Sequence, residues 1–397
     1  MYIEQKMYGF RAKLDYWLKH NALFEDIFLA LGGFALRMIG KFIKIDEHMV
    51  IFSGHTRKYN DSSRAIYEYM LSCSEFKNLK YIWALEDPLH VDIPGNPLKV
   101  KTDTWAYFKL CLKAKYWISC VNIERGLIFK KKNQIYLNTW HGMPFKRVGN
   151  DAGGRHGYNW YYVDYFCYAS EYEKNILKRA FGVKEKAFLA TGLPRNDELY
   201  RITGNEVIEL KNKLSIPLYK KVILYAPTWR DSNDRGNTYG IKPPMDVKKW
   251  ERELNDDYII LMRTHAYTNT LLGVEFNDFI RDYTNYPFVN DLFKVADILI
   301  SDYSAAMADY SILERPIICF GYDYDSYAAA RGLYVDLESM LPNGVQKTED
   351  EVIKLLNTMN YKEQCEMTRN MIKNKYTYLG GKACEICVNN VFKDYRR

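Results

Sequence analysis

The sequence lacks the motifs of several large enzyme classes. It contains neither GxGxxG nor GxxxxGK[ST], which excludes the dinucleotide fingerprint and the P-loop, and it has no serine nucleophile elbow. No secretory signal is present, and the most apolar run, residues 27–39, is interrupted by Arg37. Its 13 residues are fewer than the ~20 that a membrane-spanning helix needs. Internal repeats and low-complexity tracts are also missing, so we expect an ordinary globular chain.

The chain of 397 residues has eight cysteines, far fewer than a disulfide-rich scaffold of its length would need. The cysteines are scattered through apolar contexts, as reduced and buried cysteines usually are, which predicts a cytoplasmic protein without disulfides. Cys384 and Cys387 have CxxC spacing, but neither a second pair nor a nearby histidine completes a zinc set. We interpret this spacing as coincidental on a helix, and we predict no metal and no cofactor.

Charge is unevenly spread along the chain. Lysine and arginine number 56 against 49 aspartates and glutamates, a net charge of +7, yet residues 101–150 alone hold ten basic and two acidic residues. This concentration predicts either a solvated basic face or a locally acidic partner such as an anionic lipid surface, a phosphate polymer or nucleic acid. No nucleic-acid recognition motif accompanies the charge, so nucleic acid is excluded as a partner. The triplet at 130–132 is predicted to face lipid or solvent.

Residues 1–45 combine the apolar run with flanking aromatic and basic side chains. Trp17 and Leu18 precede the run, and Lys41 and Lys44 follow it. This pattern fits a basic amphipathic helix that lies in a membrane interface. A core-packed helix explains the same residues, and the sequence leaves both interpretations open.

From residue 48 onward, short apolar runs alternate with helical stretches. The alternation predicts an α/β fold with parallel, helix-covered sheets, and the length predicts two domains with an appendage. Strands are expected at 48–54, 79–87, 115–121, 133–140, 220–229, 257–265, 287–291, 296–302, 316–323 and 332–337, and helices at 62–71, 104–114 and from about 350 onward. The polar stretch 200–219 is the expected linker. A ligand is expected in a cleft between the carboxyl ends of the two sheets.

The segment TWHGMPFKRVG (139–149) follows one predicted strand. His141 lies at the strand end beside Gly142, and Lys146 and Arg147 come soon after. An imidazole there can accept a proton near neutral pH, and the two cations favour an anionic substrate. A hydrogen-bonded structural histidine at a turn is the alternative.

Arginine and histidine follow two predicted strands in the second half of the chain. Arg263 and His265 belong to RTH (263–265), and Arg230 closes APTWRD (226–231). At neighbouring strand ends these side chains would form a phosphate cradle. Each is a weak signal alone, because exposed loop arginines are common.

The segment ISDYSAAMADYS (300–311) follows another predicted strand. Ser301, Asp302 and Ser304 are good N-cap residues for a helix whose first turn would begin at Ala305. The free N–H groups at such a helix start attract anions. Plain helix capping explains Asp302 or Ser304 but not the whole cluster.

Seven segments together resemble the CDP-glycerol glycerophosphotransferase family, which includes the teichoic acid primases and polymerases of Gram-positive bacteria. The segments are WHGMP (140–144), RAFGV (179–183), TGLPRND (191–197), KKVILYAPTWRD (220–231), RTH (263–265), VADILISDYSAAMADYSILERPIICF (295–320) and RGLYVDLE (331–338). Three positions depart from the family pattern: Met143 replaces the threonine of WHGTP, Ala305 replaces the second serine of SDYSS, and Leu333 replaces the phenylalanine of RGFY.

The resemblance implies a glycosyltransferase GT-B-like α/β fold of two Rossmann-like domains facing across a cleft. The implied division is amphipathic helices at 1–45, an acceptor domain at 46–205, a CDP-donor domain at 206–375 and a C-terminal helix at 376–397. It also implies a peripheral enzyme on the cytoplasmic face of the cell membrane. Such an enzyme transfers glycerol phosphate or ribitol phosphate from a CDP-alditol to a lipid-linked or polymeric acceptor and releases CMP, in the biosynthesis of teichoic acid or a phosphate-containing capsule.

The resemblance also assigns roles to residues. His141 resembles the family's general base on the acceptor hydroxyl, and His265 and Asp302 complete the implied catalytic set. His265, Arg230 and the helix start at 301–304 resemble the pyrophosphate-binding elements, and Asp302 would orient hydroxyl groups. The residues implied to bind substrate are Gly142, Lys146, Arg147, Arg195, Asp197, Thr228, Arg230, Arg263, Ser301 and Ser304.

Two other functions remain open from the sequence. One is a glycosyltransferase of the same fold that uses a nucleotide sugar, which would incorporate sugar without transferring phosphate. The other is a catalytically silent scaffold on the membrane, for which replacing His141 or His265 by alanine would leave polymer production in cells unchanged.

Overall fold

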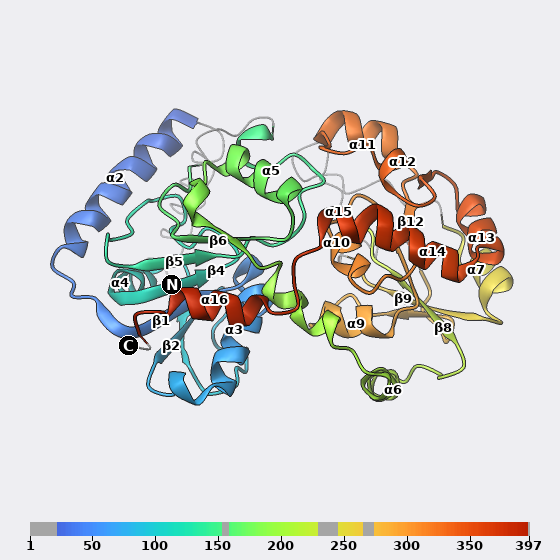
Figure 1. The fold of residues 1–397 in the computed structure, drawn as a ribbon, viewed down its shortest axis with the longest axis horizontal. Helices are drawn as coiled ribbons and strands as arrows, with labels where there is room; N and C mark the ends of the chain where they lie inside the picture. The colour runs from blue at the N-terminus through green and yellow to red at the C-terminus, as the bar shows by residue number, and fades with distance from the viewer. Residues whose placement is uncertain (1–21, 153–158, 229–244, 265–273, 396–397) are drawn as a thin grey trace, which may run out of the picture. The chain divides into compact units, whose positions relative to one another are not determined.

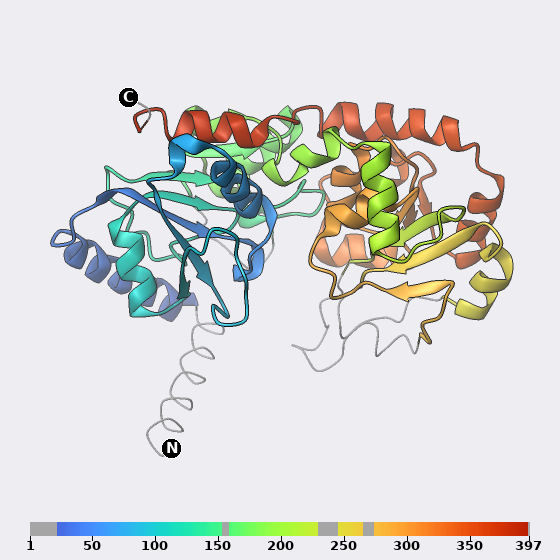
Figure 2. The ribbon, with the colours of Figure 1, turned by 90° about the horizontal axis from the view of Figure 1, so that it is seen from below.

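The computed structural model describes residues 22–152, 159–228, 245–264 and 274–395. The chain divides into two compact units, Met1–Asn138 with Val391–Arg397, and Thr139–Asn390. Strands form one seven-stranded and one six-stranded sheet (Figures 1 and 2). The predicted α/β class with two parallel sheets is therefore confirmed, whereas the predicted domain boundaries stay a prediction.

The first unit alternates strands with helices. Its described elements, where η denotes a 3-10 helix, are α2 (Ala22–Gly40), β1 (Asp46–Ser53), η1 (His55–Arg57), α3 (Asp61–Ser72), η2 (Ser74–Phe76), β2 (Lys80–Leu85), β3 (Leu98–Lys101), α4 (Trp105–Lys113), β4 (Ala114–Ser119) and β5 (Ile135–Asn138). The seven-stranded sheet has the order β3-β2-β1-β4-β5-β6-β7, in which β6 is Tyr165–Tyr168 and β7 is Phe188–Ala190. Strand β1 pairs in parallel with β2 and β4. Val50, Ile51 and Phe52 of β1 are fully buried, as expected for a parallel strand covered on both faces.

The second unit contains the remaining elements. They are η3 (Gly149–Asp151), β6 (Tyr165–Tyr168), α5 (Glu171–Phe181), η4 (Glu185–Ala187), β7 (Phe188–Ala190), η5 (Pro194–Tyr200), α6 (Gly204–Lys213), β8 (Lys221–Tyr225), α7 (Val247–Leu254), β9 (Tyr258–Met262), β10 (Ile280–Asp282), α9 (Val289–Val295), β11 (Ile298–Ser301), α10 (Ala306–Ser311), β12 (Ile317–Phe320), α11 (Tyr324–Arg331), α12 (Leu337–Met340), β13 (Val345–Gln346), α13 (Glu349–Thr358), α14 (Tyr361–Thr368), the π-helix η6 (Arg369–Lys373), α15 (Asn374–Tyr376) and α16 (Ala383–Val391). The six-stranded sheet has the order β10-β9-β8-β11-β12-β13, and β8 pairs in parallel with β9 and β11.

Two predicted strands are wrong. The segment predicted at 287–291 contains the start of helix α9, because Val289, Leu292 and Phe293 repeat at helical spacing and face the core. The segment predicted at 332–337 makes only one isolated bridge, from Leu333 to Lys146, before α12 begins. The stretch predicted as a linker, 200–219, contains helix α6.

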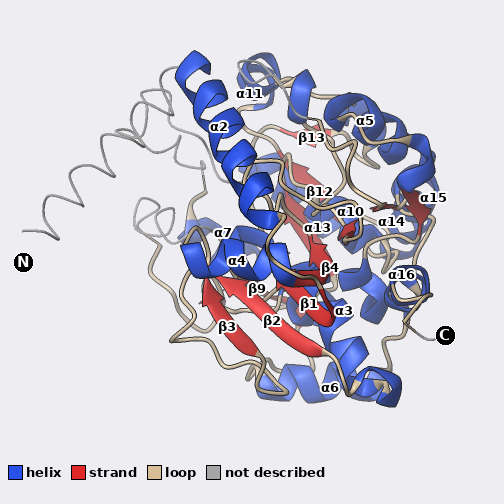
Figure 3. Cartoon of the chain, turned by 90° about the vertical axis from the view of Figure 1, so that its left-hand side faces the viewer, coloured by secondary structure: helices blue, strands red, loops and turns tan. Residues whose placement is uncertain are grey.

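Helix α2 packs against the rest of the first unit (Figure 3). Its glycines make the close contacts. A Cβ at Gly33 would lie only 1.8 Å from the carbonyl oxygen of Leu127, and one at Gly40 would lie 3.0 Å from a methyl group of Leu112 on α4. The other side of the helix exposes large apolar side chains, among them Leu31 and Phe34 at 65% and 57%. One face of the helix is therefore packed on the unit and another is exposed. Among the described helices, none is long and apolar enough to cross a membrane.

Candidate active site

The strand order of the six-stranded sheet reverses between β8 and β11. From β8 the chain continues to β9 and β10 on one side, and from β11 it continues to β12 and β13 on the other. Open parallel sheets bind ligands outside the carboxyl ends of their strands at such a point. Thr228 follows β8, Ser301 is the last residue of β11, and residues 302–304 follow it, so several predicted site residues lie at this position.

Two buried side chains connect these segments. Asp302 Oδ1 accepts hydrogen bonds from the backbone N–H groups of Thr228 at 2.8 Å and Tyr303 at 2.6 Å. Ser301 Oγ donates to the carbonyl of Ala226 at 2.6 Å. Both side chains hold the loop after β8 against the end of β11. Their predicted contacts with substrate stay predictions.

Ser304 lies at the start of α10, which begins one residue later than predicted, at Ala306. Its Oγ accepts a hydrogen bond from the N–H of Ala306 at 3.2 Å. The hydroxyl therefore satisfies one N–H group of the first helical turn, but the N-cap residue of α10 is Ala305, and the helix has no side-chain cap of the kind that the simpler interpretation expected.

Arg263 follows β9, and its guanidinium is held in place by a backbone group. The backbone N–H of Arg263 donates to the carbonyl of Tyr225 at 2.9 Å, and Nη1 of its guanidinium donates to the carbonyl of Tyr286. Burial lowers the pKa of this arginine, so an anion that approached it would offset part of the desolvation cost. The other two members of the predicted cradle, Arg230 and His265, lie outside the described residues.

His141 begins a sharply turned loop after β5. The preceding residue, Trp140, has a φ of +55°, which is uncommon for a residue with a side chain. Its ring packs on Phe181, with centroids 4.6 Å apart, and lies 3.9 Å from the centroid of the His141 ring. The aromatic packing thus holds the strained residue that directs the histidine.

Gly142 brings this loop against the start of α10. The glycine is buried with a φ of +153°, and a Cβ there would lie 2.9 Å from the Cβ of Ala305. The same Cβ would lie 3.7 Å from Nη2 of Arg195. Three predicted parts of the site, namely the His141 loop, Arg195 and the segment before α10, therefore lie side by side within the second unit.

A buried ion pair lies under this junction. Arg195 Nη2 is 2.7 Å from Oδ2 of Asp309, and their side chains are 12% and 9% exposed. Asn196 Nδ2 donates to the other carboxylate oxygen of Asp309 at 2.7 Å, and Asn290 Nδ2 donates to the carbonyl of Arg195 at 2.7 Å. Asp309 therefore links α10 to η5 and holds the Arg195 guanidinium beside Gly142.

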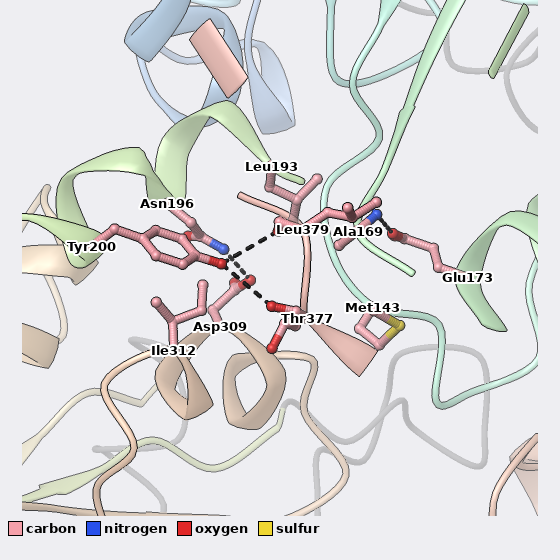
Figure 4. Close-up of a pocket in the computed structure, with 10 residues that line it drawn as sticks. All are labelled: Met143, Ala169, Glu173, Leu193, Asn196, Tyr200, Asp309, Ile312, Thr377 and Leu379. Atoms are coloured by element: carbon pink, nitrogen blue, oxygen red, sulfur yellow. Dashed lines mark hydrogen bonds between the residues drawn. The ribbon is translucent and has the colours of Figure 1, made fainter. Parts of the chain in front are cut away.

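A small cavity of about 10 Å³ lies beside Asp309. Figure 4 shows the side chains that line it. Met143 from the histidine loop, Asp309 and Glu173 contribute to its wall. Glu173 is 0% exposed, and its Oε2 accepts a hydrogen bond from the N–H of Ala169 at 2.6 Å. Burial raises the pKa of Glu173 to about 7, and the Asp309 carboxylate adds to that effect.

Sequence reasoning missed Glu173, Asn196 and Asp309. A signal for Glu173 was present, because Ser170 and Glu173 have the spacing of a helix N-cap and its third residue, and Ser170 Oγ accepts the N–H of Glu173 at 3.3 Å. Asp309 lies one turn into a helix of small and apolar residues, where a carboxylate needs a partner.

Lys146 and Arg147 continue the histidine loop as a short extended segment. Lys146 forms the bridge to Leu333, and the N–H of Arg147 donates to the carbonyl of Gly332 at 3.1 Å. The N–H of Tyr334 donates to the carbonyl of Phe145 at 2.8 Å. This pairing fixes the far end of the loop.

Asp197 contacts the start of helix α16 instead of the Arg195–Asp309 ion pair. Its two carboxylate oxygens accept the N–H groups of Ala383 at 2.8 Å and Cys384 at 2.7 Å, at the start of α16. The carboxylate thus caps a helix, a favourable position because the helix start carries partial positive charge. Its predicted contact with substrate stays a prediction.

No group of side chains among the described residues could hold a metal ion. The predicted absence of a metal and of a cofactor stays a prediction, since parts of the loops around the site lie outside those residues.

Comparison with known proteins places these observations in a family. Residues 35–393 match the family described as CDP-glycerol:poly(glycerophosphate) glycerophosphotransferase. A teichoic acid poly(glycerol phosphate) polymerase from Staphylococcus epidermidis is 35% identical over 331 residues, which cover 78% of this chain but only 45% of the polymerase. A teichoic acid glycerol-phosphate transferase from Staphylococcus aureus is 32% identical over 333 residues, which cover 78% of this chain and 84% of the transferase.

A solved structure agrees with the sequence matches. The wall teichoic acid polymerase TagF is 30% identical and superposes with a TM-score of 0.80, covering 99% of this chain and 98% of that chain. A TagF variant with one histidine replaced by asparagine was solved with CDPG; it has a TM-score of 0.79 and 30% identity, and covers 91% of this chain and 93% of that chain. The chain therefore belongs to the CDP-glycerol:poly(glycerophosphate) glycerophosphotransferase family.

Proposed function

We propose that this protein transfers glycerol phosphate or ribitol phosphate from a CDP-alditol donor to a lipid-linked or polymeric acceptor and releases CMP. The observation that carries the proposal is the packing of the His141 loop on the start of α10, with Gly142 against Ala305 and Arg195 beside them. This packing brings a possible proton acceptor close to the carboxyl end of β11, where a donor would bind in such a sheet. Family membership and the CDPG in the similar TagF structure support the same donor class.

The proposed reaction is a displacement at phosphorus. The acceptor hydroxyl oxygen forms a bond to the phosphorus that bears the alditol, and the bond from that phosphorus to the bridging oxygen breaks. CMP leaves with the bridging oxygen and its electron pair, and His141 takes the proton of the hydroxyl. Such a reaction needs an aligned nucleophile and positive charge near the phosphorus more than it needs covalent catalysis. Arg263 and the predicted Arg230 and His265 would supply that charge.

The donor and the transferred group are tested by product analysis. Purified protein is incubated with CDP-glycerol or CDP-ribitol and a panel of lipid-linked acceptors, CMP is quantified, and the products are analysed by mass spectrometry. We expect stoichiometric CMP and a product heavier by one or more alditol phosphates. Sugar incorporation without phosphate transfer would instead establish a glycosyltransferase. A folded protein that turned over neither donor with any acceptor would contradict the proposal.

We also propose that the protein acts as a peripheral protein on an anionic membrane at its cytoplasmic face. The support is the exposed side of α2, where Leu23, Ile27, Leu31, Phe34 and Met38 recur at spacings of three and four residues. Such a stripe can enter the boundary between headgroups and acyl chains. Replacing Leu31 and Phe34 with serine should weaken binding to vesicles without lowering stability, because both side chains are more than half exposed. Unchanged binding would contradict this location.

A further inference from the structure

A basic pocket lies at the C-terminal end of α2, and none of the residues of the candidate active site lines it. Its volume is about 510 Å³, and its wall includes five cations, contributed by the end of α2, the segment after it and the segment before β5. The cations are Arg37, Lys41, Lys44, Lys130 and Lys131. One carboxylate, Glu47, also lines the pocket, but it is 2.8 Å from Lys115, which neutralises it.

Two cations of this pocket, Arg37 and Lys131, are held by neutral backbone groups. Lys131 Nζ donates to the carbonyl of Ile43 at 2.5 Å, and Arg37 Nη1 donates to the carbonyl of Ile128 at 2.6 Å. Within the described part of the chain, no carboxylate lies within 4.0 Å of the charged groups of Arg37, Lys41, Lys44 or Lys131.

Burial makes this arrangement costly without an anion. Lys131 is half-buried, and desolvation lowers its pKa. The C-terminal end of a helix carries a partial charge of about −0.5, which opposes anion binding. The carbonyls of Met38, Ile39 and Gly40 already accept backbone N–H groups there, and the five cations outweigh that partial charge. An anion in the pocket would therefore offset the desolvation of Lys131.

The neighbouring apolar side chains indicate what kind of anion fits. Phe42 is 88% exposed and lies in sequence between Lys41 and the carbonyl of Ile43 that Lys131 contacts. The apolar stripe of α2 ends at Met38, just before this pocket. A phosphate attached to an acyl chain could use both features, whereas a free phosphate could use only the cations.

We propose that this pocket binds the phosphate of an anionic membrane lipid while the apolar stripe of α2 enters the acyl boundary. The inference rests on the proposed membrane location and adds a defined headgroup site to it. The pocket then sets the orientation of the first unit on the membrane, because α2 is fixed to that unit through Gly33 and Gly40. If lipid binding depended only on the overall positive charge of this surface, replacing three lysines inside the pocket or three outside it would weaken vesicle binding by the same factor.

The test compares two triple variants of the full chain that lose the same charge. The pocket variant carries Lys41→Gln, Lys44→Gln and Lys131→Gln; the control carries Lys58→Gln, Lys77→Gln and Lys132→Gln, which are exposed residues of the same unit outside the pocket. Sedimentation with phosphatidylcholine vesicles, with and without phosphatidylglycerol, measures partitioning. Because each cation near an anionic surface contributes about fivefold, we expect the pocket variant to lose about a hundredfold on phosphatidylglycerol vesicles and the control less than about tenfold.

Further measurements distinguish a failure of the headgroup site from a failure of the proposed membrane location. The pocket variant should bind pure phosphatidylcholine like the wild type, through the apolar stripe. If Lys131→Gln lowers the melting temperature, the double variant Lys41→Gln/Lys44→Gln should still show a loss of more than tenfold, about five times five. Equal losses in the pocket and control variants would overturn the headgroup site and leave the membrane location standing. Absence of wild-type binding to either vesicle would overturn both. Stabilisation of the wild type by inorganic phosphate without vesicles, lost in the pocket variant, together with equal binding of both proteins to phosphatidylglycerol vesicles, would assign the pocket to a soluble anion and overturn the lipid site.

Discussion

Replacing Glu173 with glutamine neutralises a carboxyl group that is fully buried in the first turn of α5. One oxygen accepts the N–H of Ala169, and the amide oxygen of glutamine can keep that hydrogen bond. The other oxygen, Oε1, has no hydrogen-bond partner among the described residues. In the cavity of Figure 4 it shares the wall with Asn196 and Asp309, whose side-chain oxygens can accept hydrogen bonds from an amide N–H₂.

The size of the expected change in unfolding free energy follows from the pKa of Glu173. Burial raises it from 4.5 to about 7, so the native state keeps the proton over a range in which the unfolded chain has lost it. Stability therefore falls as the pH rises from 4.5 to about 7 and levels off above that value. The whole interval corresponds to about 3 kcal/mol of unfolding free energy, which wild type loses and the glutamine variant keeps.

The assay is urea unfolding followed by tryptophan fluorescence at about pH 5 and about pH 8. We expect similar stability of the two proteins at the lower pH and a glutamine variant more stable by about 3 kcal/mol at the higher pH. Glu171→Gln, on the exposed side of the same helix turn, is the matched control and should follow the wild-type profile. Equal pH profiles for wild type and Glu173→Gln, or a variant less stable at the higher pH, would refute the reasoning.

Three further predictions concern the junction at the candidate site. His141→Ala should lower CMP release from CDP-glycerol by about 10²–10⁴-fold with unchanged circular dichroism, as loss of a general base does; intact activity would remove the assigned role. Gly142→Ala should place a methyl group 2.9 Å from the Cβ of Ala305 and lower kcat, and Ala305→Gly in the same chain should restore part of it. No recovery would mean that the contact is not the cause. Asp309→Asn should lower stability by about 3–5 kcal/mol, because the buried Arg195 guanidinium loses its counter-charge. Adding Arg195→Met should recover part of this loss in thermal unfolding, and a double variant no more stable than Asp309→Asn would argue against an isolated buried charge.

Most strands could be located from the sequence because they are buried on both faces. Runs such as Val222–Tyr225 in β8 and Tyr258–Met262 in β9 are almost wholly apolar, as parallel strands inside α/β sheets are. The strands that escaped prediction are short, as β13 with two residues and β7 and β10 with three illustrate. A run of two or three residues carries no usable periodicity, so only its pairing partner makes it a strand.

By itself, the sequence determined the alternation of strands and helices, the loops that carry His141, Arg263 and Asp302, and the resemblance to the family. These features are local, since each depends on residues that are neighbours in the chain. Only the tertiary structure decided that Asp309 pairs with Arg195, 114 positions away, and that Glu173 is buried beside them. The same is true of the close approach of Gly142 to Ala305 and of the cations gathered at the end of α2. The pairing of polar side chains that are distant in the chain arises from the packing of whole elements, and no local pattern encodes it.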